Sequence, residues 1–296
     1  MNYTQLTKQA TKAHKKARVA VVQAEGIAIF EALKEAVDLG ICHPVLVGNK
    51  DLIQADAKTV GLTDYSIIPT KDEEDSAAKA IHAVREGEAD LLMKGKLQTS
   101  TLLKAVLHKT EGLRTGKLLS HVAIFETENN KFLTVTDGGM NINPELEHKA
   151  VIIQNAVDTL ISLGIDTPKV AVLSAVEKVN PDMPSSIDAA ALVEMATQGK
   201  IKNAIVEGPL SLDLSISKRA CEIKGVNSKI NGEADILLVP NIVTGNVLGK
   251  ALILCAKYPS GGLIVGAKCP IILLSRSDTA QEKLNSIVLG VSVVVN

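Results

Sequence analysis

Aromatic side chains make up only 2% of the 296 residues, and tryptophan is absent. Proteins that bind single-stranded nucleic acid stack bases on aromatic rings, so this scarcity argues against such a surface. The net charge of −1 points the same way, because the chain has no overall positive charge to attract nucleic acid or an anionic membrane. An anionic ligand would therefore have to be held by local charges.

The sequence also lacks a cysteine framework and long apolar runs. The four cysteines are widely separated and form no CxxC pair, which argues against a zinc site or disulfides and favours a reducing compartment. Residues 1–18 are polar and basic, unlike a secretory signal. The apolar runs stay below the roughly 20 residues that a membrane span needs. We therefore expect a cytoplasmic protein with no membrane attachment.

Several catalytic motifs are missing. No GxG triplet occurs, so the dinucleotide-binding fingerprint is absent, and residues 112–117 have one residue too few between their glycines for a phosphate-binding P-loop. Neither GxSxG nor HExxH is present. Covalent serine chemistry and zinc catalysis are thus unsupported, and we expect no bound metal or cofactor.

What the chain does contain is aliphatic residues arranged in alternating strand and helix patterns. Hydrophobic residues make up 46% of the sequence, and aliphatic, glycine-punctuated strands suit parallel sheets that helices cover on both faces. The patterns predict a mainly parallel α/β fold. The main predicted strands are residues 18–22, 44–48, 89–93, 169–173, 204–207, 236–239 and 263–266, with a β-hairpin formed by residues 121–126 and 131–136.

A break in this alternation predicts two α/β lobes. Residues 137–141 form a glycine-containing stretch, and Asn143 and Pro144 supply an N-cap and a first-turn proline for a long helix. We predict a first lobe of residues 1–138 plus 272–296 and a second lobe of residues 139–271. The cleft between two such lobes is the default place for a ligand.

The most informative polar residues follow the last predicted strand. Ser275 and Arg276 come directly after the apolar run 270–274, and open α/β sheets bind ligands at the carboxyl ends of their strands. At that position Arg276 would meet an anion and Ser275 would donate to a developing oxyanion. Glu282 or Asp278 would move a proton.

A structural interpretation of the same stretch is equally open. Thr279 caps the last helix in this interpretation, Glu282 is its capping-box partner, and Arg276 pairs with Asp278. The spacing alone does not separate the two interpretations.

A second polar segment follows the predicted strand 89–93. A glycine and Lys96 precede a helix that starts near Thr99 and Ser100, and backbone N–H groups at such a helix start bind phosphate readily. Lys104 lies one turn further on, and its side chain leans back toward that end of the helix. The alternative is an ordinary capped helix with solvent-exposed lysines.

Two more polar turns follow predicted strands. Residues 240–246 contain Thr244, Gly245 and Asn246, which would place polar groups near a substrate oxygen or simply form a capped turn. Asp213 lies at the end of another segment in which a turn follows a strand. Its carboxylate either has a functional role or stabilises the turn. Taken together, these turns indicate a cleft for an anionic small molecule.

In this order and spacing, these pieces resemble the phosphate acetyl/butyryltransferase family over most of the chain. The segments that carry the resemblance are residues 94–107, 136–139, 170–174, 207–210 and 240–250, and the Ser275-Arg276 pair. Residues 180–184, 275–278 and 283–287 look most like the butyryl branch. The resemblance implies two α/β lobes around a cleft, similar to isocitrate and isopropylmalate dehydrogenases, and a homodimer.

The resemblance also implies a reaction: a short-chain acyl-CoA and phosphate give an acyl phosphate and free CoA, without metal. Ser275 and Arg276 match the family's catalytic Ser-Arg pair. Glu282 falls where the acetyl branch carries an aspartate that takes the thiol proton, and Asp278 is near enough to compete. Lys104 falls where that branch has an arginine facing the phosphate, and lysine cannot make the same bidentate fork.

The sequence is compatible with other functions. A phosphate acetyltransferase or a branched-chain phosphotransacylase is the nearest alternative. A dehydrogenase of related fold would need acidic metal ligands and a nicotinamide pocket, and no such acidic cluster stands out in the sequence. A non-catalytic protein that binds a small anion is the remaining class.

Overall fold

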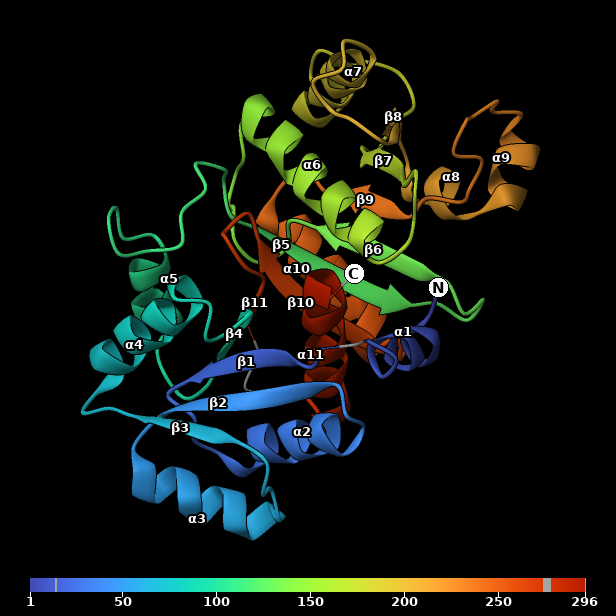
Figure 1. Ribbon diagram of the computed structural model, residues 1–296. Helices are drawn as coiled ribbons and strands as arrows, with labels where there is room; N and C mark the ends of the chain where they lie inside the picture. The colour runs from blue at the N-terminus through green and yellow to red at the C-terminus, as the bar shows by residue number, and fades with distance from the viewer. Residues whose placement is uncertain (14, 274–277, 296) are drawn as a thin grey trace. The chain divides into compact units, whose positions relative to one another are not determined.

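The computed structural model describes residues 1–13, 15–273 and 278–295. The described chain forms two compact units. The first unit contains Asn2–Lys117 and Ser260–Asn296, and the second contains Leu118–Pro259 together with Met1. Figure 1 shows the course of the chain through both units. The α/β class predicted from the sequence is confirmed.

The first unit has a mainly parallel sheet in the strand order β3-β2-β1-β4-β11-β10. β1 pairs in parallel with β2 and β4, β2 with β3, and β4 with β11, whereas β10 and β11 pair antiparallel. The strands are β1 (Ala17–Val22), β2 (Cys42–Gly48), β3 (Ser66–Pro69), β4 (Leu91–Lys94), β10 (Ser260–Val265) and β11 (Ile271–Ile272). β1, β2 and β4 are almost entirely buried, as their unbroken apolar runs predict.

Six helices of this unit are described: α1 (Tyr3–Ala10), α2 (Ile27–Asp38), α3 (Lys50–Val60), α4 (Glu73–Arg85), α5 (Thr99–Val106) and α11 (Ala280–Val295). Local chemistry sets the start of α4, because the Asp72 side chain accepts a hydrogen bond from the Asp75 N–H and three acids follow in the first turn. Helix α11 is buried continuously from Lys283 to Ser292 and packs against α2 and α1. The C-terminal helix is therefore part of the core of the unit that begins the chain.

The second unit has the strand order β5-β6-β9-β7-β8. β5 and β6 form the predicted antiparallel hairpin, and the other pairs are parallel. The strands are β5 (Ser120–Glu126), β6 (Phe132–Thr136), β7 (Lys169–Leu173), β8 (Ile205–Leu210) and β9 (Ile236–Leu238). The helices are α6 (Leu146–Ser162), α7 (Pro184–Thr197), α8 (Leu212–Ile216), α9 (Lys218–Lys224) and α10 (Ile242–Leu254).

The borders between the units differ from those predicted. The chain passes between units at residues 117/118 and 259/260, whereas the sequence suggested 138/139 and 271/272. The hairpin explains the first difference, because β6 pairs with β9 in the second unit. The second arises because β10 pairs with β11 in the first unit.

Two predicted helix starts were also wrong. Helix α6 begins at Leu146 with the extended residue Glu145 as N-cap, so Asn143 and Pro144 precede the helix instead of starting it. We also expected a helix over residues 246–257, but α10 begins four residues earlier, at Ile242, because the Asn241 side chain accepts from the Thr244 N–H and caps the helix there.

Candidate active site

Two of the strands that the predicted polar segments follow, β4 and β11, lie side by side in the first unit. β11 runs parallel to β4, with Ile271 opposite Leu92 and Ile272 opposite Met93. The segment after β4, which contains Lys96, therefore starts beside the end of β11. Ser275 and Arg276 lie outside the described residues.

The loop after β4 fits closely against the end of β1. The N–H of Gly95 donates to the Val22 carbonyl and the N–H of Lys96 to the Gln23 carbonyl, each at 2.8 Å. A Cβ at position 95 would lie 2.1 Å from the Gln23 carbonyl oxygen, a distance that real Cβ contacts do not reach. Glycine is required here by the close approach of two backbones, which fixes the position of Lys96.

A partly buried carboxylate pairs with the exposed side chain of Lys96. Its Nζ lies 3.2 Å from Glu25 Oε2, and the exposed fraction of the side chain is 73% for Lys96 and 14% for Glu25. Gln23 Nε2 donates to the other oxygen of Glu25 at 2.6 Å, and Ser76 Oγ donates to Gln23 Oε1 at 2.7 Å. This hydrogen-bond network was not predicted from the sequence. The available signal was the polar stretch Gln23-Ala24-Glu25-Gly26, which also follows a strand.

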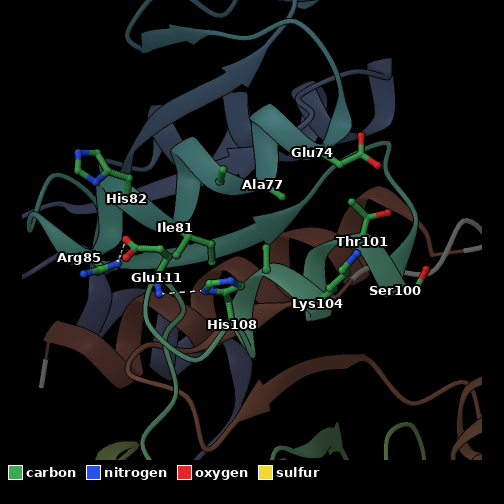
Figure 2. A pocket seen from close by; sticks show the side chains of 12 residues that line it. Glu74, Ala77, Ile81, His82, Arg85, Ser100, Thr101, Lys104, His108 and Glu111 are labelled. Carbon is green, nitrogen blue, oxygen red and sulfur yellow. Dashed lines mark hydrogen bonds and ion pairs between the residues drawn. The ribbon is translucent and has the colours of Figure 1, made fainter.

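Helix α5 brings Thr99, Ser100 and Lys104 onto one short segment. Thr99 is its first residue, and within the described chain its N-cap Gln98 makes no side-chain hydrogen bond to the first turn. Among the described residues, the N–H of Thr101 already donates to the Gln98 carbonyl at 3.1 Å, so it is the N–H groups of Thr99 and Ser100 that keep the capacity to bind an anion. Ser100 and Lys104 line a pocket of about 540 Å³ between α4 and α5, whereas Thr99 and Lys96 do not. Figure 2 shows Ser100, Thr101 and Lys104 at one end of this pocket.

Glu282 forms the predicted capping box at the start of α11. Its Oε2 accepts from the Thr279 N–H at 2.7 Å and from Thr279 Oγ1 at 2.9 Å, and its own N–H donates to Thr279 Oγ1 at 3.2 Å. This confirms the structural interpretation for Thr279 and Glu282. The backbone carbonyl of Asp278 accepts from Lys283 Nζ.

The remaining predicted site residues belong to the second unit and share the first turns of α10. Thr244 donates through its N–H and its hydroxyl to Asn241 Oδ1, so the capped-turn interpretation is confirmed for it. A Cβ on Gly245 would lie 2.7 Å from the Cα of Gly138, so packing alone explains a glycine there. Asn246 Nδ2 approaches the Gly138 carbonyl at 3.5 Å.

Asp213 serves a surface ion cluster. Hydrogen bonds from Ser211 and then from Lys224 lower its pKa to about 2. Its Oδ2 lies 2.9 Å from Lys224 Nζ, which also lies 3.4 Å from Glu177 Oε1. This fits the turn-stabilising interpretation of the carboxylate.

The buried thiols are poor nucleophiles. Burial raises the pKa of Cys42 and of Cys269 to about 12, and it also raises the pKa of Cys221. Because the thiolate is the reactive form, these three side chains are inert at neutral pH. Over the described residues, no group of three or more His, Cys, Asp or Glu side chains has the geometry to hold a metal ion.

None of the helices in the described chain is both long and apolar enough to cross a bilayer.

Comparisons with known proteins agree with one another. The model of the family described as "Phosphate acetyl/butaryl transferase" matches residues 70–291. The chain is 43% identical over 294 residues to a phosphate butyryltransferase of Clostridium acetobutylicum, covering 98% of this chain and 97% of that protein. It is 40% identical over 276 residues to a phosphate acetyltransferase of Thermotoga maritima, covering 92% and 94%.

The fold leads to the same group of proteins. A crystal structure of a branched-chain phosphotransacylase from Enterococcus faecalis matches with a TM-score of 0.86 at 35% identity, covering 94% of this chain and 99% of that one. A 4-hydroxythreonine-4-phosphate dehydrogenase from Klebsiella pneumoniae matches with a TM-score of 0.60 at 15% identity, which is a likeness of fold only.

These findings define an enzyme of the acyltransferase class, whose substrates are a CoA thioester and phosphate. The chain belongs to the phosphate acetyl/butyryl transferase family.

Proposed function

We propose that this enzyme transfers a butyryl group between CoA and inorganic phosphate, so that butyryl-CoA and phosphate give butyryl phosphate and CoA. The observation that carries the proposal is the 43% identity to a phosphate butyryltransferase over nearly the full length of both chains. The parallel pairing of β4 and β11 supports it, because it starts two polar segments at one sheet edge.

In the proposed mechanism, both substrates are bound together and no acyl-enzyme forms. A phosphate oxygen attacks the thioester carbonyl carbon, and the C–O bond forms as the carbonyl oxygen becomes an oxyanion. Ser275, Arg276 and the N–H groups at the start of α5 are the proposed donors to the anions. The oxyanion then collapses to the carbonyl as the C–S bond breaks, and a carboxylic acid group gives its proton to the leaving sulfur and becomes a carboxylate. In the reverse direction that carboxylate takes the proton of the CoA thiol, which is mainly protonated near pH 7 (pKa about 8.5).

The other predicted binding residues enter this proposal as contacts to phosphate and CoA. Lys96, Lys104, Thr99 and Ser100 would supply positive charge and hydroxyl donors on the segment after β4. Thr244, Gly245 and Asn246 would supply polar contacts from the start of α10. The proposal needs no metal, so turnover in EDTA should be close to that in its absence.

The proposal is tested by measuring thiol release with acetyl-, propionyl-, butyryl-, isobutyryl- and isovaleryl-CoA, each with and without phosphate. Phosphate-dependent release with the highest kcat/KM for butyryl-CoA supports it. Release that does not need phosphate would contradict acyl transfer to phosphate. A preference for isobutyryl- or isovaleryl-CoA would instead favour the branched-chain activity, for which the 0.86 TM-score to a branched-chain phosphotransacylase is the specific support.

The proton-transfer role can be assigned with two substitutions. Glutamine at position 282 keeps an oxygen that can accept from Thr279, so Glu282→Gln preserves the capping box while removing the base. We expect Glu282→Gln to lower kcat by about 10²-fold, the low end for loss of general acid–base catalysis, and to lower it more than Asp278→Asn does.

Melting temperatures of the two variants provide the control, since both should melt within a few degrees of the parent. If Asp278→Asn has the larger effect on kcat, the proton-transfer role moves to Asp278. If neither variant changes kcat, Glu282 has only its capping role.

We further propose that the enzyme is a homodimer and that α10 contributes to its interface. Val243, Val247 and Leu254 are 67%, 63% and 61% exposed, and they lie on one face of α10 because they are spaced by multiples of about 3.6 residues. A row of large exposed apolar side chains on one helix supports contact with a second copy of the chain.

A charge in the middle of this row should weaken the dimer. We expect Val247→Glu to raise the dimer dissociation constant at least 10-fold in sedimentation velocity experiments, because the carboxylate would be desolvated at the interface. Ile223→Glu is the matched control, since Ile223 is 74% exposed on α9, and it should leave the dissociation constant unchanged. A parent protein that stays monomeric at all concentrations would contradict the dimer.

A cytoplasmic location is also part of the proposal. It is supported by the four cysteines, which are all free thiols, as expected in a reducing compartment.

A further inference from the structure

The pocket between α4 and α5 lies entirely within the first unit. The apolar part of its lining consists of small or aliphatic side chains: Ala77, Ala78 and Ile81 from α4 and Ala105 from α5. A volume of about 540 Å³ is within the range of small-molecule sites. The alanines leave room where longer side chains would close the gap between the helices.

Polar groups occupy the two ends of the pocket. Ser100, Thr101 and Lys104 lie at the end where α5 begins, with Glu74 on the opposite wall (Figure 2). At the other end Arg85 forms an ion pair with Glu111, whose N–H donates to the ring of His108 at 3.1 Å. The first end is the one joined to the loop after β4.

The charges of the lining are balanced. Two carboxylates, Glu74 and Glu111, balance the cationic Lys104 and Arg85, and Arg85 is already paired. A ligand that suits this lining is neutral, carries both hydrogen-bond donors and acceptors, and has apolar carbon along its length. The hydroxyls of Ser100 and Thr101 can donate to carbonyl groups, and Glu74 can accept from an amide N–H.

We propose that this pocket binds the pantetheine arm of the CoA thioester, an inference that rests on the proposed function. The arm is an uncharged chain with two amides, a hydroxyl and a dimethyl-substituted carbon. Its carbon atoms match the apolar part of the lining, and its amides match the Ser100 and Thr101 hydroxyls and the Glu74 carboxylate. The eight residues of α5 extend about 12 Å along the pocket. If the thioester reacts beside the loop after β4, the acyl end of the arm lies at the Ser100 end of the pocket. The nucleotide end then lies near Arg85 and His108.

The test narrows the pocket without touching a proposed catalytic or binding residue. Ala78 is an exposed residue of the lining, so Ala78→Phe fills space without entering the core. Ala55→Phe is the matched control, because Ala55 is exposed on α3 and is not among the residues that line the pocket. Three thioesters are compared at saturating phosphate: butyryl-CoA, butyryl-pantetheine and butyryl-N-acetylcysteamine, which lacks most of the arm.

The proposal predicts that Ala78→Phe raises KM at least 10-fold for butyryl-CoA and butyryl-pantetheine and less than twofold for butyryl-N-acetylcysteamine. The KM for phosphate should stay within twofold, and Ala55→Phe should match the parent throughout. Unchanged KM for all three thioesters would overturn the proposal. A higher KM for butyryl-CoA alone would also overturn the proposal, since the pocket would then bind the nucleotide and not the arm. Equal increases in KM for all three thioesters would also overturn it, since the substitution would then act on binding of the acyl end that they share.

Calorimetry separates failure of this inference from failure of the proposed function. If the parent turns over no acyl-CoA, the proposed function fails. Free CoA should still bind the parent at least 10-fold more tightly than Ala78→Phe if the pocket takes the arm. Equal affinity of the two proteins for CoA would overturn the pocket assignment whether or not the parent is active.

Discussion

Replacing Arg276 by alanine is expected to lower kcat by about 100-fold or more while the protein keeps its fold. The guanidinium is proposed to lie at the anion that forms in the transition state, and removal of one such donor typically costs about 3–4 kcal/mol. Thiol release with saturating butyryl-CoA and phosphate measures the loss. Because phosphate is also an anion, we expect its KM to rise in the same variant.

Arg219→Ala is the matched control for this prediction. Arg219 is an exposed arginine of α9 in the second unit, and its loss should leave kcat within twofold of the parent. Near-normal activity of Arg276→Ala, with an unchanged melting temperature, would remove Arg276 from the mechanism.

The second large effect concerns stability and is expected at Gly95. A methyl group there would lie 2.1 Å from the Gln23 carbonyl oxygen and 2.6 Å from that of Val22, and both are backbone atoms that cannot turn away. We expect Gly95→Ala to lower the free energy of unfolding by about 3 kcal/mol, or the melting temperature by about 5–10 °C. Differential scanning calorimetry measures this change.

Gly249→Ala provides a control in the opposite direction. Gly249 lies within α10, and a Cβ there would meet only Phe125 Cζ at an ordinary 3.5 Å. Alanine should therefore stabilise the helix by about 0.5–1 kcal/mol. A Gly95→Ala protein that melts with the parent would show that the close backbone approach at the end of β1 does not restrain the loop.

Local patterns in the sequence predicted much of the fold. The run 169–173 coincides with β7, and the hairpin of β5 and β6 was predicted within a residue or two of its bounds. The capping box of Thr279 and Glu282 was also predictable, because its partners are three residues apart. Such features depend on neighbours in the chain, so their signal is contained in a short window of sequence.

Features that depend on distant partners were not predictable in the same way. The ion pair between Lys96 and Glu25 joins residues 71 positions apart, and no local pattern identifies it. The borders between the units were misplaced for the same reason, since strand pairing assigned the β5–β6 hairpin and β10 to their units. The start of α10 was misplaced because Asn241 competes with the residues after it for the N-cap position.

We propose that phosphate attacks the thioester where β4 and β11 end. A crystal structure with CoA and phosphate bound tests it most directly. We expect the phosphate to lie within hydrogen-bonding distance of the Arg276 guanidinium and of residues 94–100, with the CoA sulfur beside it. Phosphate and sulfur bound together at another place on the protein, with Arg276 contacting neither, would contradict it.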